Sequence, residues 1–248
     1  MAQTERGDRG RSTPETRLLF SHENRSSGLL QAVRTFGEML SGFRTLHFVG
    51  PCVTVFGSAR FAEDHPAYRM GMDVGGALAR EGFTVMTGGG PGIMEAATRG
   101  AKEAGGETVG CGIHLPHEQR FSAYLDTYKE FRYFFTRKVM LMKYSYGFIA
   151  LPGGFGTLDE LFETATLVQT RKMPDYPIVL MGTEYWAPLI GFLRERLLAG
   201  GTIDAEDVDT LLLTDDPAEA AASVRNAAVS RFGLTYTQRP RRRWWLLE

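Results

Sequence analysis

The feature that most constrains the fold is an apolar run that leads directly into a glycine turn and a helical pattern. The run 146–151 is followed by Pro152-Gly-Gly-Phe-Gly-Thr157, and apolar residues then recur at helical spacing from Leu158 to Val168. A continuous apolar run of this length is typical of a parallel strand covered on both faces. Glycines let backbone N–H groups approach an anion, and a helix N-terminus favours negative charge. The segment therefore predicts a strand, a phosphate-binding turn and a helix start.

A second corner of the same kind occurs earlier in the chain. Residues 82–87 are typical of a buried strand, and Gly88-Gly-Gly-Pro-Gly92 then leads into a helix from about Ile93. A single glycine loop is weak evidence, because tight strand-to-helix turns need glycine for geometry alone. Two such loops after predicted strands indicate a ligand site, because open parallel sheets bind ligands at the carboxyl ends of their strands.

Predicted strands and helices alternate along most of the chain. Apolar residues at positions 29–40 predict an amphipathic helix before the first strand. The alternation that follows predicts an α/β fold, a Rossmann-like doubly wound parallel sheet with helices on both faces. The predicted strands lie near 52–56, 83–87, 107–113, 146–151 and 177–181, and the helices near 66–81, 93–105, 134–145, 157–170, 186–199 and 217–231.

One compact domain with two tails accounts for the 248 residues, of which 43% are hydrophobic. Residues 1–27 are too polar to offset the entropy of ordering, and we expect a disordered N-terminal tail there. Residues 28–232 form the predicted Rossmann-like domain. Residues 233–248 are a basic, aromatic C-terminal tail; its mixture of arginine and tryptophan suits anionic lipid or nucleic acid, and is also typical of an unstructured segment.

Composition excludes several classes of partner. The net charge of −1 provides no basic footprint for nucleic acid, and no run of about twenty apolar residues predicts a membrane span. The first residues lack the apolar core of a signal peptide. Cys52 and Cys111 lie in predicted buried strands without metal-type spacing. We therefore expect reduced thiols, a cytoplasmic protein, and neither nucleic acid nor membrane as a partner.

Three motifs together resemble those of the LONELY GUY (LOG) phosphoribohydrolases, which are often labelled lysine decarboxylases. They are Gly88-Gly-Gly-Pro-Gly-Ile-Met-Glu95, Phe134-Phe-Thr-Arg-Lys138 and Pro152-Gly-Gly-Phe-Gly-Thr-Leu-Asp-Glu160, within a resemblance that covers about residues 50–225. The resemblance implies a Rossmann-like homodimer that acts on a small nucleotide. It would hydrolyse the N-glycosidic bond of cytokinin riboside 5′-monophosphate or AMP to free base and ribose 5-phosphate, without a cofactor or a metal.

The same resemblance implies the site residues. Arg137 and Glu160 match the catalytic pair of the family. The positions predicted to contact substrate, from the resemblance and the glycine turns, are Ser58, Gly89, Gly90, Gly92, Glu118, Lys138, Gly153, Gly154, Gly156, Thr157 and Thr166. Glu95 stands where many shorter plant-type members have glycine, which bears on the base that is preferred.

Each of these residues also has a structural interpretation. Thr157-Leu-Asp-Glu160 has the pattern of a capping box, in which Glu160 closes onto the helix N-terminus. Arg137 fits a solvated cation on an amphipathic helix, and Ser58 fits a cap for the segment that follows it. His114 and His117 bracket a strand end, but two histidines without a third ligand are weak evidence for metal.

Three classes of function remain open from the sequence. The first is the hydrolase. The second is a carrier that binds a phosphorylated ligand without consuming it, because molybdenum-cofactor carrier proteins share the Rossmann-like fold; a carrier has no need of Arg137 and Glu160. The third is a pyridoxal-phosphate decarboxylase, which requires a Schiff-base lysine that the motifs do not indicate.

Overall fold

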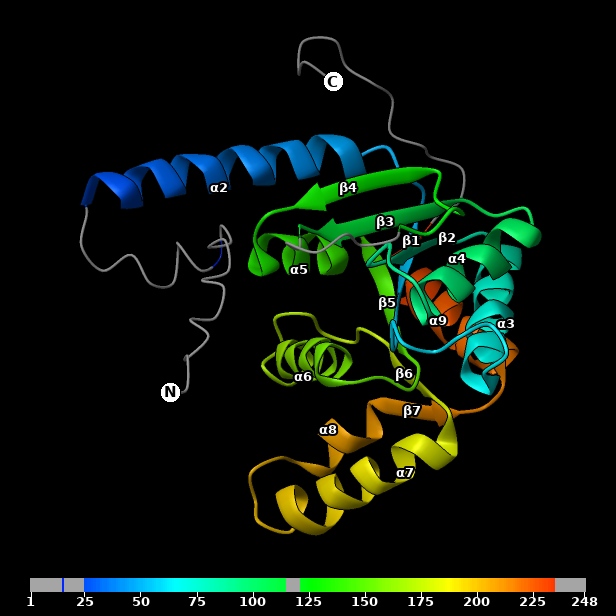
Figure 1. Ribbon diagram of the computed structural model, residues 1–248. Coiled ribbons are helices and arrows are strands. Elements are labelled where there is room, and N and C mark those ends of the chain that lie inside the picture. Colours follow the sequence, from blue (N-terminus) through cyan, green and yellow to red (C-terminus); the bar gives the residue numbers. More distant parts are fainter. Residues whose placement is uncertain (1–14, 16–24, 115–120, 235–248) are drawn as a thin grey trace, which may run out of the picture.

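The computed structural model describes residue 15 and residues 25–114 and 121–234. Within these ranges the chain forms a seven-stranded sheet in the order β4-β3-β2-β1-β5-β6-β7, and every neighbouring pair is parallel (Figure 1). The strands are β1 (Cys52–Phe56), β2 (Thr84–Thr87), β3 (Thr108–Ile113), β4 (Thr127–Phe131), β5 (Ser145–Ala150), β6 (Ile178–Met181) and β7 (Leu211–Thr214).

One helix precedes the first strand, one follows the last, and the others connect strands, with no helix described between β3 and β4. They are α2 (Arg25–Leu46), α3 (Pro66–Arg80), α4 (Ile93–Glu103), α5 (Phe134–Lys143), α6 (Phe155–Gln169), α7 (Thr183–Phe192), α8 (Ala205–Asp209) and α9 (Pro217–Ser230), with a π-helical continuation of α7 over Leu193–Leu198. None of the helices in the described part of the chain is both long and apolar enough to cross a membrane.

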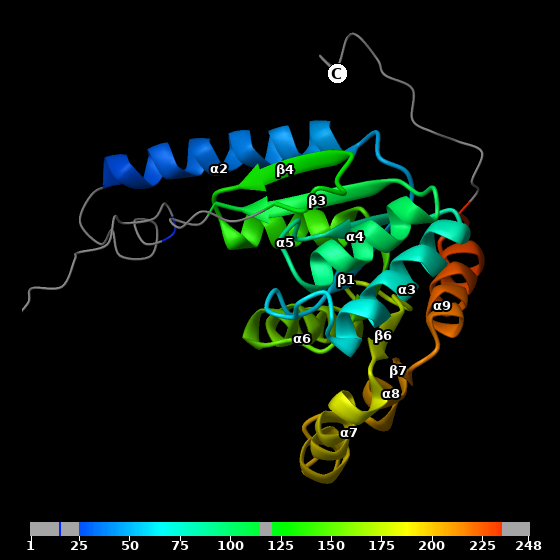
Figure 2. The same cartoon turned by 45° about the vertical axis from the view of Figure 1, so that its right-hand side comes forward.

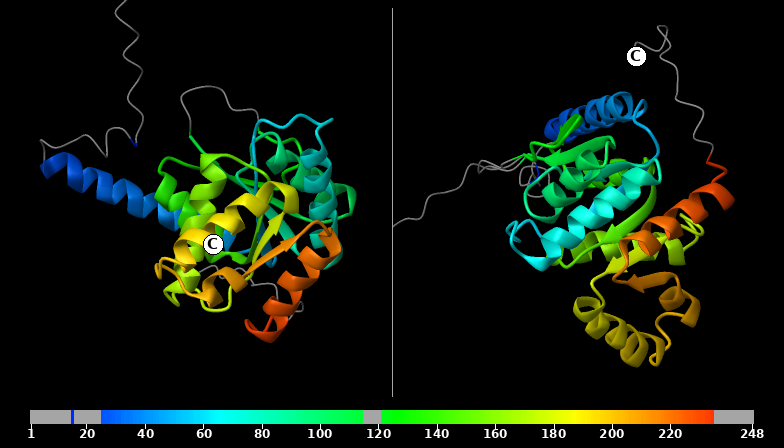
Figure 3. Two further views of the ribbon diagram at one scale, coloured as in Figure 1. Left: turned by 90° about the horizontal axis from the view of Figure 1, so that it is seen from below. Right: turned by 90° about the vertical axis from the view of Figure 1, so that its right-hand side faces the viewer.

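Alternating residues of the strands pack against two separate layers of helices, because successive side chains of a strand point to opposite faces of the sheet. In β1, Val53 and Val55 face the cluster that includes α3, α4 and α9. Cys52 and Phe56 face the opposite cluster, which includes α5, α6 and α7. The two layers lie on opposite sides of the sheet (Figure 3). The predicted doubly wound fold with helices on both faces is therefore confirmed.

The order of the strands creates one switch point. The chain moves outward from β1 through β2 and β3 to β4, and then crosses back through α5 to place β5 on the other side of β1. Loops after β1 and β5 consequently leave the sheet in opposite directions, which opens a crevice at their carboxyl ends. This is where open parallel sheets bind ligands.

The two outer strands and one short helix differ from the prediction. The strand β4 reads Thr-Tyr-Lys-Glu-Phe and has only one buried residue, Phe131, because it lies at the edge of the sheet. The helix α2 runs alongside it (Figure 2), and the Lys129 ammonium donates to the Ser41 hydroxyl across that contact. The opposite edge strand, β7, is four residues long, and α8 is five. Segments as short as β7 and α8, and a strand as polar as β4, carry little periodic signal.

The predicted N-terminal helix also differs in extent. The helix α2 begins at Arg25 and ends at Leu46. Met39, Phe43 and Leu46, near its carboxyl end, pack against the described core. The earlier apolar positions that predicted the helix are exposed: Leu29, Leu30, Val33, Phe36 and Leu40. Most of the two predicted tails, 1–27 and 233–248, lies outside the described residues, so these boundaries stay predictions.

Candidate active site

Backbone hydrogen bonds join the loops that leave β1, β2 and β5 at the switch point. The Ser58 N–H donates to the Pro152 carbonyl (3.0 Å), and the Ser58 carbonyl accepts from the Ile93 N–H (3.0 Å). Ser58 therefore links the two glycine loops through its backbone. Its hydroxyl oxygen accepts from the Arg60 N–H at 3.1 Å, and its own hydroxyl hydrogen has no acceptor among the described residues, so it can donate to a ligand. Both interpretations of Ser58 are compatible with this geometry.

The first glycine loop is held in a conformation that other residues rarely adopt. Gly89 and Gly92 have φ values of 74° and 68°. A Cβ on Gly92 would lie 2.4 Å from the Ser58 carbonyl oxygen, so the loop packs closely against the turn after β1. Gly90 is buried between them. Gly92 is the N-cap of α4 without a side-chain cap, which leaves backbone donors at this helix start.

The second glycine loop has a closed side and an open side. A Cβ on Gly153 would lie 2.1 Å from the Thr157 hydroxyl oxygen, so this position admits only glycine. Gly154 and Gly156 are exposed, and a Cβ on either would meet nothing within 4 Å. The open side presents the first turn of α6, where the Thr157 N–H donates to the Gly154 carbonyl at 3.0 Å and the earlier N–H groups, at Phe155 and Gly156, precede the first intrahelical acceptor. An anion can therefore reach these donors directly.

The capping-box interpretation of Thr157 and Glu160 is wrong. The helix α6 begins at Phe155 with Gly154 as its N-cap, and no side chain caps it. Thr157 lies in the first turn and Glu160 in the second, so the Glu160 carboxylate is too far along the helix to close onto the N-cap. The role of Glu160 must therefore be inferred from its burial and its charged neighbours.

Glu160 is a buried carboxylate without a hydrogen bond to one of its oxygens. The side chain is 3% exposed, and within the described part of the chain Oε2 has no hydrogen-bond partner. Burial raises its pKa to about 7, against the charges of Arg137 and Lys138, which lower it. An unpartnered carboxyl of this pKa is a feature of functional sites, where it can exchange a proton near neutral pH.

Arg137 is held by β3 and by the loop after β2, beside the glycine loops at the carboxyl ends of the strands. Its Nε donates to the Cys111 carbonyl at 2.9 Å. One terminal nitrogen lies 2.8 Å from the place a Cβ on Gly88 would occupy, so the guanidinium lies against the first glycine loop. The solvated-cation interpretation is therefore wrong, because Arg137 is half-buried and directed across the strand ends.

Lys138 and Thr166 lie in a different place. The Lys138 ammonium pairs with the Asp159 carboxylate at 2.9 Å and the Glu163 carboxylate at 2.7 Å. The Thr166 hydroxyl donates to the Phe162 carbonyl, three helical turns from the glycine loop. Together these residues line a shallow groove of about 400 Å³ between α5 and α6. The structure brings the other described site residues to the switch point but places Lys138 and Thr166 in this groove.

Two predicted positions cannot be placed. Glu118 and His117 lie outside the described residues. His114 is described, and its Nδ1 lies 3.5 Å from the Glu130 carboxylate rather than beside other ligand-type side chains.

Sequence reasoning missed two tyrosines near the site. The Tyr185 hydroxyl, from α7, donates to the Gly153 carbonyl at 2.5 Å and supports the second glycine loop. Tyr128, from the edge strand β4, lies over Gly89 and Gly112, and its hydroxyl is buried without a partner among the described residues. Neither lies in a motif, so only the polar-apolar alternation of β4 could have signalled Tyr128.

Comparisons with known proteins identify the family and the fold. Residues 94–224 match the family model described as "possible lysine decarboxylase". A cytokinin riboside 5′-monophosphate phosphoribohydrolase of Mycobacterium tuberculosis is 32% identical over 160 residues, which cover 60% of this chain and 80% of that protein. A probable enzyme of the same name from Oryza sativa subsp. japonica is 32% identical over 134 residues, or 52% of this chain; the match spans about half of that relative's length, 53%.

One similar solved structure is that of a carrier protein rather than of an enzyme. The molybdenum cofactor carrier protein of Chlamydomonas reinhardtii is 28% identical, with a TM-score of 0.53 over 73% of this chain and 99% of that one. The fold is therefore shared by enzymes and a carrier. The family match, the two glycine loops and the order of the motifs together show that this chain belongs to the LOG family, whose model is described as "possible lysine decarboxylase".

Proposed function

We propose that the protein hydrolyses the N-glycosidic bond of nucleoside 5′-monophosphates, with cytokinin riboside 5′-monophosphate or AMP as substrate. The observation that carries the proposal is Glu160, a buried carboxyl with an unpartnered oxygen and a pKa of about 7. A site that only holds a ligand gains nothing from this group, because burying an unpartnered carboxyl costs stability. The phosphoribohydrolase names of the relatives support the same reaction.

The chemistry follows from the bond that breaks. As the bond from C1′ to the base nitrogen lengthens, positive charge develops on C1′ and the ring oxygen, as in glycoside hydrolysis. The ionised Glu160 carboxylate stabilises that charge and accepts a proton from the attacking water. The water oxygen bonds to C1′, the base leaves with the bonding electrons, and the proton that Glu160 accepted passes to the base, which regenerates the carboxylate. The products are free base and ribose 5-phosphate.

Arg137 and the glycine loops supply position and charge. Backbone donors of the open side, at Gly154 and Gly156, bind the 5′-phosphate at the start of α6. The Arg137 guanidinium, held by the Cys111 carbonyl, orients the nucleotide or offsets negative charge on the departing base. Binding energy from the phosphate, which does not react, then contributes to catalysis at C1′.

A carrier of a phosphorylated ligand is the second candidate, and the similarity to the Chlamydomonas carrier favours it. A carrier explains the glycine loops. It does not explain why the protein keeps the Glu160 carboxyl buried without a partner at the expense of stability. A pyridoxal-phosphate enzyme is less well supported by the site. Its lysine must lose a proton to form a Schiff base, whereas Lys138 is held between two carboxylates that stabilise the ammonium form.

The product of the reaction tests the proposal. Purified protein is incubated with a panel of nucleoside 5′-monophosphates, and free base and ribose 5-phosphate are separated by chromatography. We expect equimolar release of both from at least one adenine nucleotide. Tight binding of the nucleotides with no release of base would assign the protein to the carrier class.

Arg137→Ala should lower kcat/KM for base release by about 10²–10³, the usual effect of removing one charge-stabilising group. The fold should change little, because the side chain gives up one hydrogen bond worth about 1 kcal/mol. Base release and thermal melting are measured side by side. The matched control is Arg132→Ala, an exposed arginine just before α5. A loss of stability large enough to explain the lost activity would contradict a role in the reaction.

We also propose a homodimer. The helices that carry Arg137 and Glu160 have several exposed apolar side chains, and an exposed patch of this kind on a soluble protein marks an interaction surface. They are Phe134, Phe135, Val139, Phe155 and Phe162, with Phe155 92% exposed. Sedimentation of a single monomeric species at all concentrations would contradict the dimer.

A further inference from the structure

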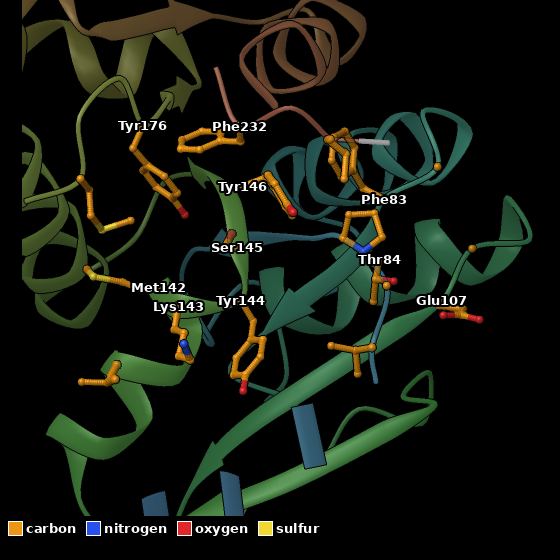
Figure 4. Close-up of a pocket in the computed structure, with 18 of the residues that line it drawn as sticks. Phe83, Thr84, Glu107, Met142, Lys143, Tyr144, Ser145, Tyr146, Tyr176 and Phe232 are labelled. Atoms are coloured by element: carbon orange, nitrogen blue, oxygen red, sulfur yellow. The ribbon is translucent and has the colours of Figure 1, made fainter. Parts of the chain in front are cut away.

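A large cavity lies at the amino ends of the strands, at the end of the sheet opposite to the candidate active site. Its volume is about 1140 Å³, and it is lined by the residues that precede or begin β1, β2, β3 and β5 (Figure 4). In a parallel sheet these amino ends lie one strand length from the carboxyl ends that hold the glycine loops. The cavity exceeds the roughly 300–1,000 Å³ of typical small-molecule sites, which suits a peptide segment better than a nucleotide.

Five aromatic residues contribute to the lining; Phe83 and Tyr176 are buried, Tyr144 and Tyr146 are half-buried, and Phe232 is exposed. Tyr144 caps the end of α5, and Tyr146 lies near the start of β5. Phe83 precedes β2, Tyr176 precedes β6, and Phe232 follows α9 (Figure 4). Tyr146 and Phe232 meet edge to face, with ring centroids 5.9 Å apart. Rings arranged in this way offer faces and edges to other aromatic side chains and to guanidinium groups.

The described part of the chain ends inside this lining. Gly233 has a φ of 62°, and the Leu234 N–H donates to the Ala228 carbonyl at 3.0 Å, which closes the end of α9. Phe232 and Leu234 themselves line the cavity. Residues 235–248 therefore follow directly from its wall. Fourteen residues span up to about 45 Å when extended, so every part of this segment can reach the cavity.

The chemistry of this segment matches the cavity. Residues 235–248 read Thr-Tyr-Thr-Gln-Arg-Pro-Arg-Arg-Arg-Trp-Trp-Leu-Leu-Glu, with four arginines and three aromatic residues. The carboxyl ends of α3, α4, α5 and α6 point to this edge of the sheet, and helix carboxyl ends carry partial negative charge. The lining side chains are balanced, with Glu107 and Glu163 against Lys143 and Lys172. The helix ends therefore set a field that favours the cationic segment.

We propose that residues 235–248 bind in this cavity of their own chain, with the tryptophans against the aromatic lining. The proposal rests on the cavity and on the chain that leaves it, and is independent of the reaction at the other edge. It assigns a partner to the one motif of the sequence that the proposed function does not use.

Tryptophan fluorescence tests this in the full chain. The protein has three tryptophans, Trp186, Trp244 and Trp245. Trp186 is 1% exposed and bonded to the Met181 carbonyl, so acrylamide reaches it poorly and quenching reports the other two. We expect quenching several-fold weaker than in a free peptide of residues 235–248. Tyr146→Lys places a cation in the cavity and should restore quenching to nearly that of the peptide.

A second variant and a control keep the result interpretable. Pro174→Lys places a cation at another exposed position of the cavity wall, away from the proposed dimer surface, so it tests the cavity even where Tyr146→Lys fails to fold. Ala205→Lys adds the same single positive charge on α8, at an exposed position outside the lining, and should leave quenching unchanged. Quenching as strong as in the free peptide overturns the proposal, as does weak quenching that neither cavity variant alters. Protection that disappears on dilution shows that a second copy supplies the segment, and also overturns it.

Discussion

Glu160→Gln should abolish base release, with a loss of about 10²–10⁴ in kcat, while the protein still binds AMP. The substitution keeps the size and shape of the side chain and leaves both glycine loops intact. It removes only the negative charge that the proposed mechanism places beside C1′. Single-turnover assays with chromatographic detection of the base measure the first effect, and calorimetric titration with AMP measures the second.

The same variant should be more stable than the parent at pH 8. The pKa of Glu160 is raised from 4.5 to about 7 in the folded protein, so the folded state disfavours the ionised form. This cost is absent below pH 4.5, grows between pH 4.5 and pH 7, and is complete above pH 7. At pH 8 its upper limit is about 3 kcal/mol, which glutamine relieves because it carries no charge. Thermal melts at pH 5 and pH 8 should therefore differ between the two proteins mainly at pH 8.

The pH dependence of the parent provides an independent check. Because the mechanism needs the ionised carboxylate, kcat/KM should rise as pH passes through about 7. Glu206→Gln, on the exposed surface of α8, is the matched control and should change neither activity nor stability. Turnover by Glu160→Gln close to that of the parent would remove Glu160 from the reaction.

Adenosine should be a far poorer substrate than AMP, and ribose 5-phosphate should compete with AMP. The open side of the second glycine loop offers backbone N–H donors to a phosphate. Adenosine has no phosphate, so these donors stay without an anionic partner when it binds. Hydrogen bonds to a charged group contribute about 1.5–3 kcal/mol each, so two of them change kcat/KM by roughly 10²–10⁴. Steady-state kinetics on both substrates, with ribose 5-phosphate as inhibitor, measure the difference.

Gly156→Ala sharpens this test. A Cβ at that position meets no other atom within 4 Å, and alanine favours a helix more than glycine, so stability should not fall. The methyl group nevertheless occupies the space through which a phosphate approaches the first turn of α6. We expect a lower kcat/KM for AMP and little change for adenosine. Gly191→Ala in α7, which also enters open space, is the control. Equal kcat/KM values for AMP and adenosine in the parent would refute the phosphate site.

Local pattern was sufficient to predict much of this protein. The run 146–151 and the glycines after it specify a strand, a turn and a helix start within about twenty residues, because each depends only on neighbours in the chain. The alternation of such units predicted the parallel sheet. It also predicted that both glycine loops lie at one edge of it, because parallel strands share the direction of their ends.

The burial, the pKa values and the distant contacts of the site residues were decided by the tertiary structure. The motif 157–160 is equally compatible with a capping box, and only the start of α6 at Phe155 and the packing around Glu160 turned it into a buried carboxyl with a raised pKa. The outer strands β4 and β7 become strands by pairing with neighbours distant in sequence, not by their own pattern. Arg137 gains its place from the Cys111 carbonyl, 26 residues away. Burial, pKa and such contacts depend on atoms that approach only when the sheet forms, so no local pattern encodes them.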